Sequence, residues 1–269
     1  MSLDRAFLER ALAAAQRAAD AAEAVILPRY RARDFSIETK ADETPVTEAD
    51  REAEAAIKRV LRASFPEHAF YGEEEGREGE GDFLWLIDPI DGTKSFVRGY
   101  PFFSTQIALM HAHEIVVGVS AAGAFGERMW ATRGGGAFLS SRDNGGKAAA
   151  VRVSTASTCD AQTAISTGNL KTLAAGSRWS ALADLVLRSG RTRGYGDFVH
   201  YHLLARGAID LVIESDLNIL DIAPLVLIVR EAGGVFTDLE GRDVGLATTS
   251  ALAGPAALHA LALRALSHA

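Results

Sequence analysis

The chain has 269 residues but only one cysteine, Cys159, and it lacks any long apolar run. One cysteine excludes an internal disulfide framework and fits a reducing cytoplasm, where we expect the protein to reside. No window approaches the ~18 consecutive apolar residues of a membrane-spanning helix. The first residues, MSLDRAFLER, carry charges and lack the apolar core of a secretion signal. These absences predict a cytoplasmic globular protein with no membrane partner.

An excess of positive charge is also lacking, because 28 Lys and Arg residues stand against 35 Asp and Glu residues, for a net charge of −7. The acids are dispersed along the chain, which disfavours nonspecific binding of nucleic acid. The length is enough for one large domain or for two halves that share a core. A polar, glycine-rich run at 141–150 is the best candidate junction. We therefore expect two halves, 1–148 and 149–269, packed as one compact unit.

Apolar spacing predicts the elements of the first half. Residues 4–27 repeat apolar side chains at intervals of three and four, and their many alanines indicate close packing against another element or another subunit. Thr47 is expected to cap a second helix, with Asp50 in the capping-box position. The wholly apolar run FLWLI at 83–87 predicts a buried strand, and 104–120 predicts two strands joined by a turn.

The second half alternates strand and helix patterns, which favours an α/β fold with helices covering mixed sheets. The expected strands are residues 151–154, 161–166, 209–214 and 235–239. The expected helices are residues 179–190 with Gly190 as the stop, a segment through Gly207, residues 220–234 ending at Gly233-Gly234, and residues 254–266. A loop is expected at 191–197.

The stretch WLIDPIDGTKSF at 85–96 places two acids, Asp88 and Asp91, around a proline. Pro89 favours an extended conformation for Asp88, so the strand is expected to carry that acid to its tip. Gly92 permits a sharp turn after the second acid. The stretch is therefore expected to be a strand that ends in a tight acidic turn.

This turn suits metal and phosphate chemistry. Asp88, Asp91 and the carbonyl of Ile90 offer oxygen ligands to a hard cation. Thr93 is expected to cap a helix that begins at Lys94, and the free N–H groups of a helix start suit a phosphate. The alternative is an ordinary Asx-type turn with a helix cap, since Asp, Pro and Gly are common turn residues.

The motif resembles the first signature of the inositol monophosphatase superfamily, W-x-x-D-P-I/L-D-G-T, and the resemblance extends over nearly the whole chain. The family's G-E-E segment is matched by residues 72–74, and its second signature, W-D-x-A-A-x-x-x-I-V-x-E-A-G-G, by residues 220–234. Leu220 and Pro224 depart from that signature, standing where the family has Trp and Ala. Proline is tolerated in a first helical turn, so we expect this helix to stay intact.

The resemblance implies a five-layer αβαβα sandwich of the inositol monophosphatase/fructose-1,6-bisphosphatase type, an N-terminal metal-binding half, a homodimer and sensitivity to lithium. It implies two or three Mg²⁺ ions, and a ligand set without His or Cys matches Mg²⁺ better than zinc. The implied metal ligands are Glu73, Asp88, the Ile90 carbonyl, Asp91 and Asp221.

The resemblance also implies in-line attack of a metal-activated water on a phosphate monoester. Glu73 and Thr93 would orient and deprotonate the water, and Asp50 would lie beside the site, paired with Lys40. The substrate-binding residues implied at this turn are Asp91, Gly92, Thr93 and Lys94, and the N–H groups around Gly92 to Lys94 would hold the phosphate oxygens. From the residues alone, Glu73 is equally a solvated charge, and Asp50 and Asp221 are equally helix caps.

Within the superfamily, the chain resembles the branch that hydrolyses histidinol phosphate in histidine biosynthesis. Three stretches carry this resemblance: DGTKSF with the Gly, Pro and Phe that follow, KADETPVTEAD at 40–50, and RTRGYGDF at 191–198 before Tyr201. Histidinol phosphate carries an ammonium group, so Asp197 is expected to pair with it. Glu214 matches a substrate-contacting acid of the family, and Arg193 is expected to approach the substrate from the same loop as Asp197.

Other functions remain open. An inositol-1-monophosphatase or a broad sugar-phosphate phosphatase is the leading alternative. A 3′(2′),5′-bisphosphate nucleotidase usually reads DGTKEF, and Ser95 argues against it. A metal-binding regulator without catalysis would lack a signature acid or threonine, and none is missing. The acids lie three apart, which disfavours the D-x-D phosphatases with a covalent aspartate, and the chain has neither a P-loop nor a dinucleotide fingerprint.

Overall fold

Two large β-sheets organise the chain over residues 3–39 and 45–267, which are the residues that the computed structural model describes. The first sheet has the strand order β10-β9-β8-β7-β6-β5-β3-β4, and among these strands only β3 and β5 pair in parallel. Its strands are β3 (Ala69–Gly72), β4 (Gly76–Glu78), β5 (Phe83–Asp91), β6 (Ser104–His111), β7 (Glu114–Ala122), β8 (Glu127–Thr132), β9 (Gly136–Ser141) and β10 (Ala149–Ala150).

The second sheet has the order β12-β11-β13-β15-β14, with β11 parallel to β12 and β13. Its strands are β11 (Ala164–Gly168), β12 (Arg191–Arg193), β13 (Leu211–Ser215), β14 (Val235–Thr237) and β15 (Ser250–Gly254). A separate ladder joins β1 (Ile37–Thr39) and β2 (Pro45–Thr47).

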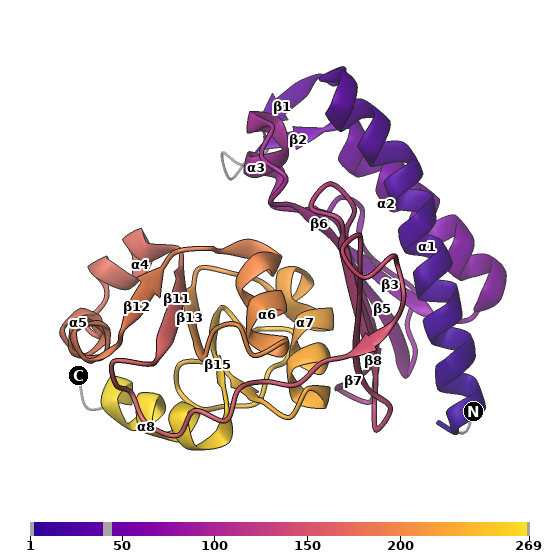
Figure 1. The fold of residues 1–269 in the computed structure, drawn as a ribbon. Coiled ribbons are helices and arrows are strands. Elements are labelled where there is room, and N and C mark those ends of the chain that lie inside the picture. Colours follow the sequence, from indigo (N-terminus) through magenta and orange to yellow (C-terminus); the bar gives the residue numbers. More distant parts are fainter. Residues whose placement is uncertain (1–2, 40–44, 268–269) are drawn as a thin grey trace.

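Helices cover and separate the two sheets, and together they make the expected αβαβα order of layers (Figure 1). Helices α1 and α2 pack on one face of the first sheet, α6 and α7 lie between the sheets, and α4, α5 and α8 cover the far face of the second sheet. The helices are α1 (Arg5–Ala32), α2 (Glu48–Ser64), α3 (Thr93–Arg98), α4 (Leu170–Ala175), α5 (Trp179–Arg188), α6 (Asp197–Ala205), α7 (Ile219–Glu231) and α8 (Ala256–Ser267).

The alanines of α1 allow this helix to pack closely on its neighbours. Ala11, Ala15, Ala18 and Ala22 are fully buried, and the helix packs against α2 and against strands β6 and β7. The helix continues to Ala32, beyond the end predicted at residue 27. The alanine pattern is therefore accounted for by packing within this chain.

Strand β5 is buried on both faces, which explains its continuous apolar run. Successive strand side chains point to opposite faces. Trp85 and Ile87 pack into the core under α1 and α2, whereas Leu84 and Leu86 pack into the core around α7. Burying a side chain of this size stabilises the fold by about 1.5–3 kcal/mol. The two predicted strands over 104–120 are β6 and β7, so that prediction is confirmed.

The segment after residue 150 is a crossing between the layers, so the strand predicted at 151–154 is wrong. The N–H of Val151 donates to the carbonyl of Ala137 on β9 (3.0 Å), and the N–H of Val153 donates to Ala232 after α7 (3.1 Å). Single hydrogen bonds to two different elements do not make a ladder. The division near residue 148 stays a prediction, because α7 packs on both sheets and one core cluster joins residues of both halves.

Three further elements of the second half were not predicted. The loop expected at 191–197 contains the edge strand β12, and the sequence pattern predicted neither α4 nor β15. Strand β15 has the sequence SALAG, and Ala and Gly have low strand propensity. It forms a strand because it lies between β13 and β14 with its residues buried.

Helix α7 accommodates Pro224 without a break. The helix begins at Ile219, so Pro224 is its sixth residue and does not lie in the first turn as predicted. The expectation that the helix stays intact is confirmed, since α7 runs on to Glu231. A Cβ on Gly118 of β7 would lie 2.9 Å from the Cα of Pro224, so this glycine lets α7 pack directly on the sheet.

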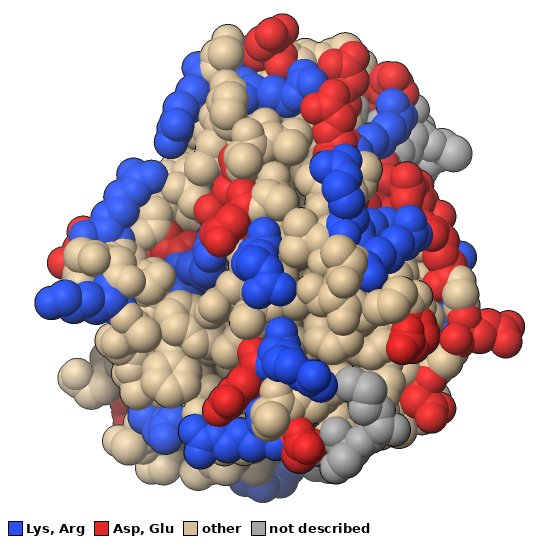
Figure 2. Space-filling view, turned by 90° about the vertical axis from the view of Figure 1, so that its right-hand side faces the viewer, with Lys and Arg blue, Asp and Glu red and all other residues tan. Residues whose placement is uncertain are grey.

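Charges of both signs are interspersed on the face of the molecule that includes α1 (Figure 2). The ion pairs of the structure include Arg29 with Glu52 and Arg128 with Glu23. This mixture agrees with the dispersed acids of the sequence. Within residues 3–39 and 45–267, no helix has the length and apolar character to cross a membrane.

Candidate metal and phosphate site

Two acids lie side by side in the first sheet because the strands β3 and β5 are parallel. Gly72 of β3 pairs with Ile87 of β5, so Glu73 and Asp88 follow at the same edge. The N–H of Glu73 donates to the carbonyl of Ile87 (3.1 Å), which fixes the backbone at this point. The spacing between the G-E-E segment and the D-P-I-D segment thus brings the two carboxylates together.

A β-bulge turns the second acid of the motif toward the first. Asp88 pairs with Gln106 and Asp91 pairs with Ser104, so β5 contains one residue more than β6 over this interval. The N–H of Ile90 donates to Asp88 Oδ1 (2.9 Å) and stabilises the bulge. The expectation that Asp88 lies at the end of the strand is wrong, because pairing resumes at Asp91.

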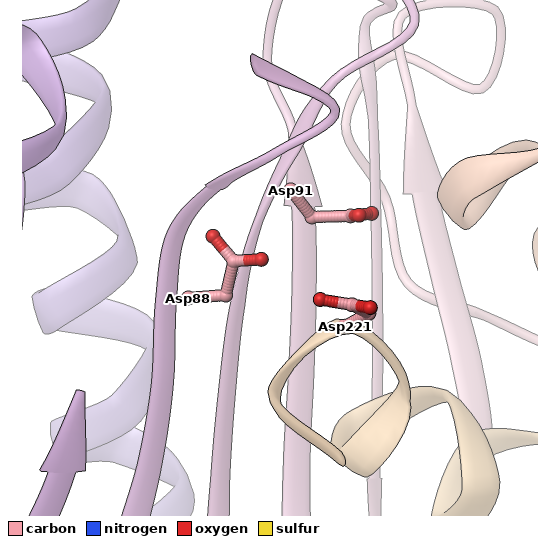
Figure 3. A group of neighbouring side chains, drawn as sticks. All are labelled: Asp88, Asp91 and Asp221. Carbon is pink, nitrogen blue, oxygen red and sulfur yellow. The ribbon is translucent and has the colours of Figure 1, made fainter. Parts of the chain in front are cut away.

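The third acid of the cluster comes from the layer between the sheets. Asp221 is the N3 residue of α7 and forms a capping box with the N-cap Asn218. Its two carboxylate oxygens accept from the backbone N–H and the side-chain amide of Asn218, at 2.8 and 2.9 Å. Carboxylate oxygens of Asp88, Asp91 and Asp221 all lie within 4.8 Å of one another (Figure 3).

Burial and mutual repulsion raise the pKa values of these carboxyls. Burial is the largest cause for Asp88 and Asp91, whose pKa values lie well above the usual range, and the neighbouring acids add to it. Burial also raises the pKa of Asp221 to about 7, despite the hydrogen bond from Asn218, which lowers it. Three crowded carboxylates made only of oxygen donors fit a hard divalent cation, which would compensate their charge.

The cluster opens into a cleft of about 580 Å³ between the layers. The cleft brings together most of the residues predicted for the site, namely Glu73, Asp88, Ile90, Asp91, Gly92, Thr93, Lys94, Asp197 and Asp221. A smaller cavity of about 50 Å³ shares Asp91, Asp197 and Asp221 with it and adds Glu214. Arg193 lines neither cavity: its side chain is exposed and donates to the carbonyl of Thr192, and its approach to the substrate stays a prediction.

Asp50 lies next to this cleft and is fixed by the cap of α2. Its Oδ2 accepts from the N–H and the hydroxyl of Thr47, as predicted for a capping box. The hydroxyl of Thr93 lies 3.5 Å from Asp50 Oδ1 and donates to the carbonyl of Ile90 at 3.0 Å. Thr93 is itself the first residue of α3 and Gly92 is the N-cap, so Thr93 does not cap the helix. The lysine expected beside Asp50 lies outside the described residues.

Glu214 is held rigidly at the far wall. Its Oε2 lies 3.0 Å from His200 Nε2 and accepts a hydrogen bond from the hydroxyl of Tyr201 (2.6 Å). A Cβ on Gly168 of the neighbouring strand would lie 1.8 Å from Glu214 Oε1, so only glycine leaves room there. Burial and the charge of Glu214 raise the pKa of Asp197 to about 6, against the opposing effects of His200 and Lys94.

The sequence reasoning missed the polar residues that complete this wall. Asn169 and Asp216 line the cleft, and the Asn169 amide donates to the carbonyls of Ser215 and Asp216, both at 2.9 Å. Asn169 follows β11 and Asp216 follows β13, and residues that follow two paired parallel strands lie at the same edge of the sheet. The pairing of these strands would have identified both residues. This pairing is not visible in the sequence.

The comparisons with known proteins agree with this geometry. The sequence profile of the Inositol monophosphatase family matches residues 8–269. The chain is 44% identical over 229 residues to a histidinol-phosphatase of Streptomyces coelicolor, covering 83% of this chain and 85% of that protein. It is 39% identical over 257 residues to a histidinol-phosphatase of Mycobacterium tuberculosis, covering 93% and 92%. Its fold is similar to the crystal structure of the extragenic suppressor protein SuhB from Bartonella henselae, with a TM-score of 0.83 and 29% identity over 97% of this chain and 98% of that one. The chain belongs to the inositol monophosphatase family.

Proposed function

We propose that the protein is a Mg²⁺-dependent phosphomonoesterase that hydrolyses histidinol phosphate to histidinol and phosphate. The observation that carries this proposal is the cluster of Asp88, Asp91 and Asp221, which opens into a cleft with a second acidic wall at Asp197 and Glu214. The similarity to two bacterial histidinol-phosphatases supports the choice of substrate.

The oxygen-only cluster fits two or three Mg²⁺ ions better than a softer metal. The residues proposed to hold them are Glu73, Asp88, the Ile90 carbonyl, Asp91 and Asp221. When bound, Mg²⁺ supplies Lewis-acid polarisation of the phosphate and lowers the pKa of water.

The chain's own groups would place the reactants for in-line attack. The Glu73 carboxylate lies in the cleft beside Asp88, where it can accept a proton from the attacking water. The Thr93 hydroxyl lies between the Ile90 carbonyl and the Asp50 carboxylate. These two groups can orient the hydroxyl toward the same water. The N–H groups from Gly92 to Lys94 and the ammonium of Lys94 would bind phosphate oxygens.

The far wall favours a leaving group that carries a positive charge. Asp197 lines the cleft and Glu214 lines the smaller cavity that shares residues with it, and two acids buried close together favour a cationic partner. Histidinol phosphate supplies an ammonium group that pairs with them, whereas inositol phosphate supplies only hydroxyls. We therefore assign the recognition of the amine to this wall, with Asp197 as the principal contact.

A substrate panel tests the proposal directly. Purified protein is assayed for phosphate release from histidinol phosphate, inositol-1-phosphate, fructose-1,6-bisphosphate and adenosine 3′,5′-bisphosphate, each with Mg²⁺ and with EDTA. We expect the highest kcat/KM for histidinol phosphate and no turnover in EDTA. A higher kcat/KM for inositol-1-phosphate would overturn the substrate, and no Mg²⁺-dependent release from any ester would overturn the phosphatase.

Replacing Asp197 tests the recognition of the amine. Asp197 has a positive φ of 44°, which asparagine tolerates better than alanine, so Asp197→Asn is the appropriate change. A charge-assisted hydrogen bond contributes roughly 1.5–3 kcal/mol, so the KM for histidinol phosphate is expected to rise about tenfold or more. The KM for inositol-1-phosphate is expected to stay nearly constant. Steady-state kinetics on both substrates check this, and an equal rise for both would contradict it.

Three further properties are proposed from the family resemblance: a homodimer, a cytoplasmic location and inhibition by lithium. Sedimentation velocity checks the first, localisation of the tagged protein by fractionation checks the second, and assays with Li⁺ added against a K⁺ control check the third.

A further inference from the structure

We infer that Glu54 is a positioning residue, which holds the turn between β3 and β4 so that the carboxylate of Glu73 stays in the acidic cluster. The inference rests on the proposed metal-dependent function and extends it to a side chain outside the cleft. Glu54 lies on α2, one helical turn after Asp50, and its side chain is 0% exposed.

The carboxylate of Glu54 caps the turn that contains Glu73. Its Oε2 accepts from the N–H of Glu74 (2.8 Å) and its Oε1 accepts from the N–H of Glu75 (3.2 Å). On the other side of Glu73, the backbone is tied to the carbonyl of Ile87. Glu73 is thus held from both sides, by the sheet before it and by Glu54 after it.

Gly72 makes this close approach possible. A Cβ on Gly72 would lie 2.0 Å from Glu54 Oε1, well inside van der Waals contact. The φ of Gly72 is not in the left-handed region, so its backbone conformation does not by itself require glycine. The need for glycine before Glu73 therefore comes from the carboxylate that packs against it.

Lys58 pairs with Glu54 in this buried place. Its ammonium, which is 2% exposed, lies 2.7 Å from Glu54 and also pairs with Glu75 (2.8 Å) and Glu78 (2.7 Å). Burial lowers the pKa of Lys58, but the hydrogen bonds to the three carboxylates outweigh it and raise the pKa. An ionised carboxylate is a stronger acceptor for backbone N–H groups than a neutral one. The same lysine ties α2 to the turn at Glu75 and to β4 at Glu78.

This arrangement makes α2 a common support for two parts of the site. Asp50 on its first turn lies beside Thr93, and Glu54 on its second turn holds the segment of Glu73. A shift of about 1 Å in a ligand or water-orienting group is enough to lower the rate strongly. Loss of the Glu54 contacts is therefore expected to act on metal binding through Glu73.

The test compares Glu54→Gln with a matched control, Glu231→Gln. Glu231 also accepts two backbone N–H groups of a hairpin, from Gly134 (2.7 Å) and Gly136 (2.8 Å), but this hairpin lies outside the cleft. The dissociation constant for Mg²⁺ is measured by calorimetry on each full chain. The Mg²⁺ concentration for half-maximal phosphate release is measured alongside. We expect Glu54→Gln to raise both values at least tenfold with little change in the KM for the ester, and Glu231→Gln to leave them unchanged.

A second variant covers the case in which Glu54→Gln fails to fold. Gly72→Ala keeps the charges of Glu54 and Lys58 but displaces the carboxylate, and it is expected to weaken Mg²⁺ binding to a similar degree. Wild-type Mg²⁺ affinity in the folded variants, equal losses in the Glu231 control, or no Mg²⁺ binding by the wild type would each overturn the inference. If the wild type binds Mg²⁺ but hydrolyses no ester, the proposed function fails, and calorimetry still decides the role of Glu54.

Discussion

Replacing Asp91 by asparagine is expected to lower kcat by about 10³-fold or more while raising the melting temperature of the metal-free protein. The change removes a ligand charge from the cluster with almost no change in side-chain volume, and losses of this order follow when one electrostatic contact to a transition state is removed. In the metal-free protein, burial is the largest cause of the raised pKa of Asp91, and repulsion by Asp197 and Asp221 raises it further. Asparagine relieves that repulsion, so we expect a gain of roughly 5 °C at pH 8.

Calorimetric melting with EDTA and with Mg²⁺, combined with steady-state kinetics, checks this result. Asp143→Asn is the control, because Asp143 lies exposed in the turn after β9. It should leave kcat, the metal-free melting temperature and the rise in melting temperature with Mg²⁺ unchanged. Retained turnover in Asp91→Asn would show that Asp91 is not part of the metal site, and a lower melting temperature without metal would show that its charge stabilises the fold.

The parts of the site that follow from local chemistry could be predicted from the sequence. Thr47 and Asp50 form the expected capping box, because that motif depends on residues three apart in one chain segment. The strand at 83–87 was visible because this part of β5 is covered on both faces, which favours a continuous apolar run. Asp88 and Asp91 were identified by their own turn residues, before any long-range contact was known.

The parts that depend on pairing between distant segments could not be predicted in the same way. The bulge between Asp88 and Asp91 exists because β5 pairs with β6 in a particular register. Glu214 on β13 acquires its fixed position from hydrogen bonds with His200 and Tyr201, which lie on α6. Arg193 shares a loop with Asp197 in the sequence, yet it lies on the edge strand β12 and is not among the residues that line the cleft. Proximity in sequence did not decide this placement, because it depends on the pairing of β12 with β11.

The same electrostatics predict that the metal-free protein loses stability as the pH rises above about 6.5. The pKa values of Asp88, Asp91 and Asp221 are raised in the folded state, in the case of Asp221 to about 7, whereas the unfolded carboxyls titrate near pH 3.9. The folded state therefore binds more protons, and the stability linked to them is present at low pH and is lost as the pH rises.

Buried histidines have the opposite effect at lower pH. Burial lowers the pKa of His68 to about 4 and also lowers the pKa values of His202 and His259. These side chains make the folded state less stable as the pH falls below their unfolded pKa of about 6.5. Above that pH they are largely neutral in both states, so the carboxyl cluster determines the slope.

We therefore expect the melting temperature in EDTA to fall by roughly 5 °C between pH 6.5 and pH 8. Mg²⁺ should raise it again at pH 8 and much less at pH 6.5, because the cation must displace the protons that the carboxyls hold. Asp91→Asn should flatten the decline, while the Asp143→Asn control should reproduce the wild-type slope. Differential scanning calorimetry over this range checks both slopes. A metal-free melting temperature that rises across the same interval would contradict this prediction. It would mean that the three carboxyls are already ionised without a cation, and that the folded cluster does not need a cation to compensate its charge.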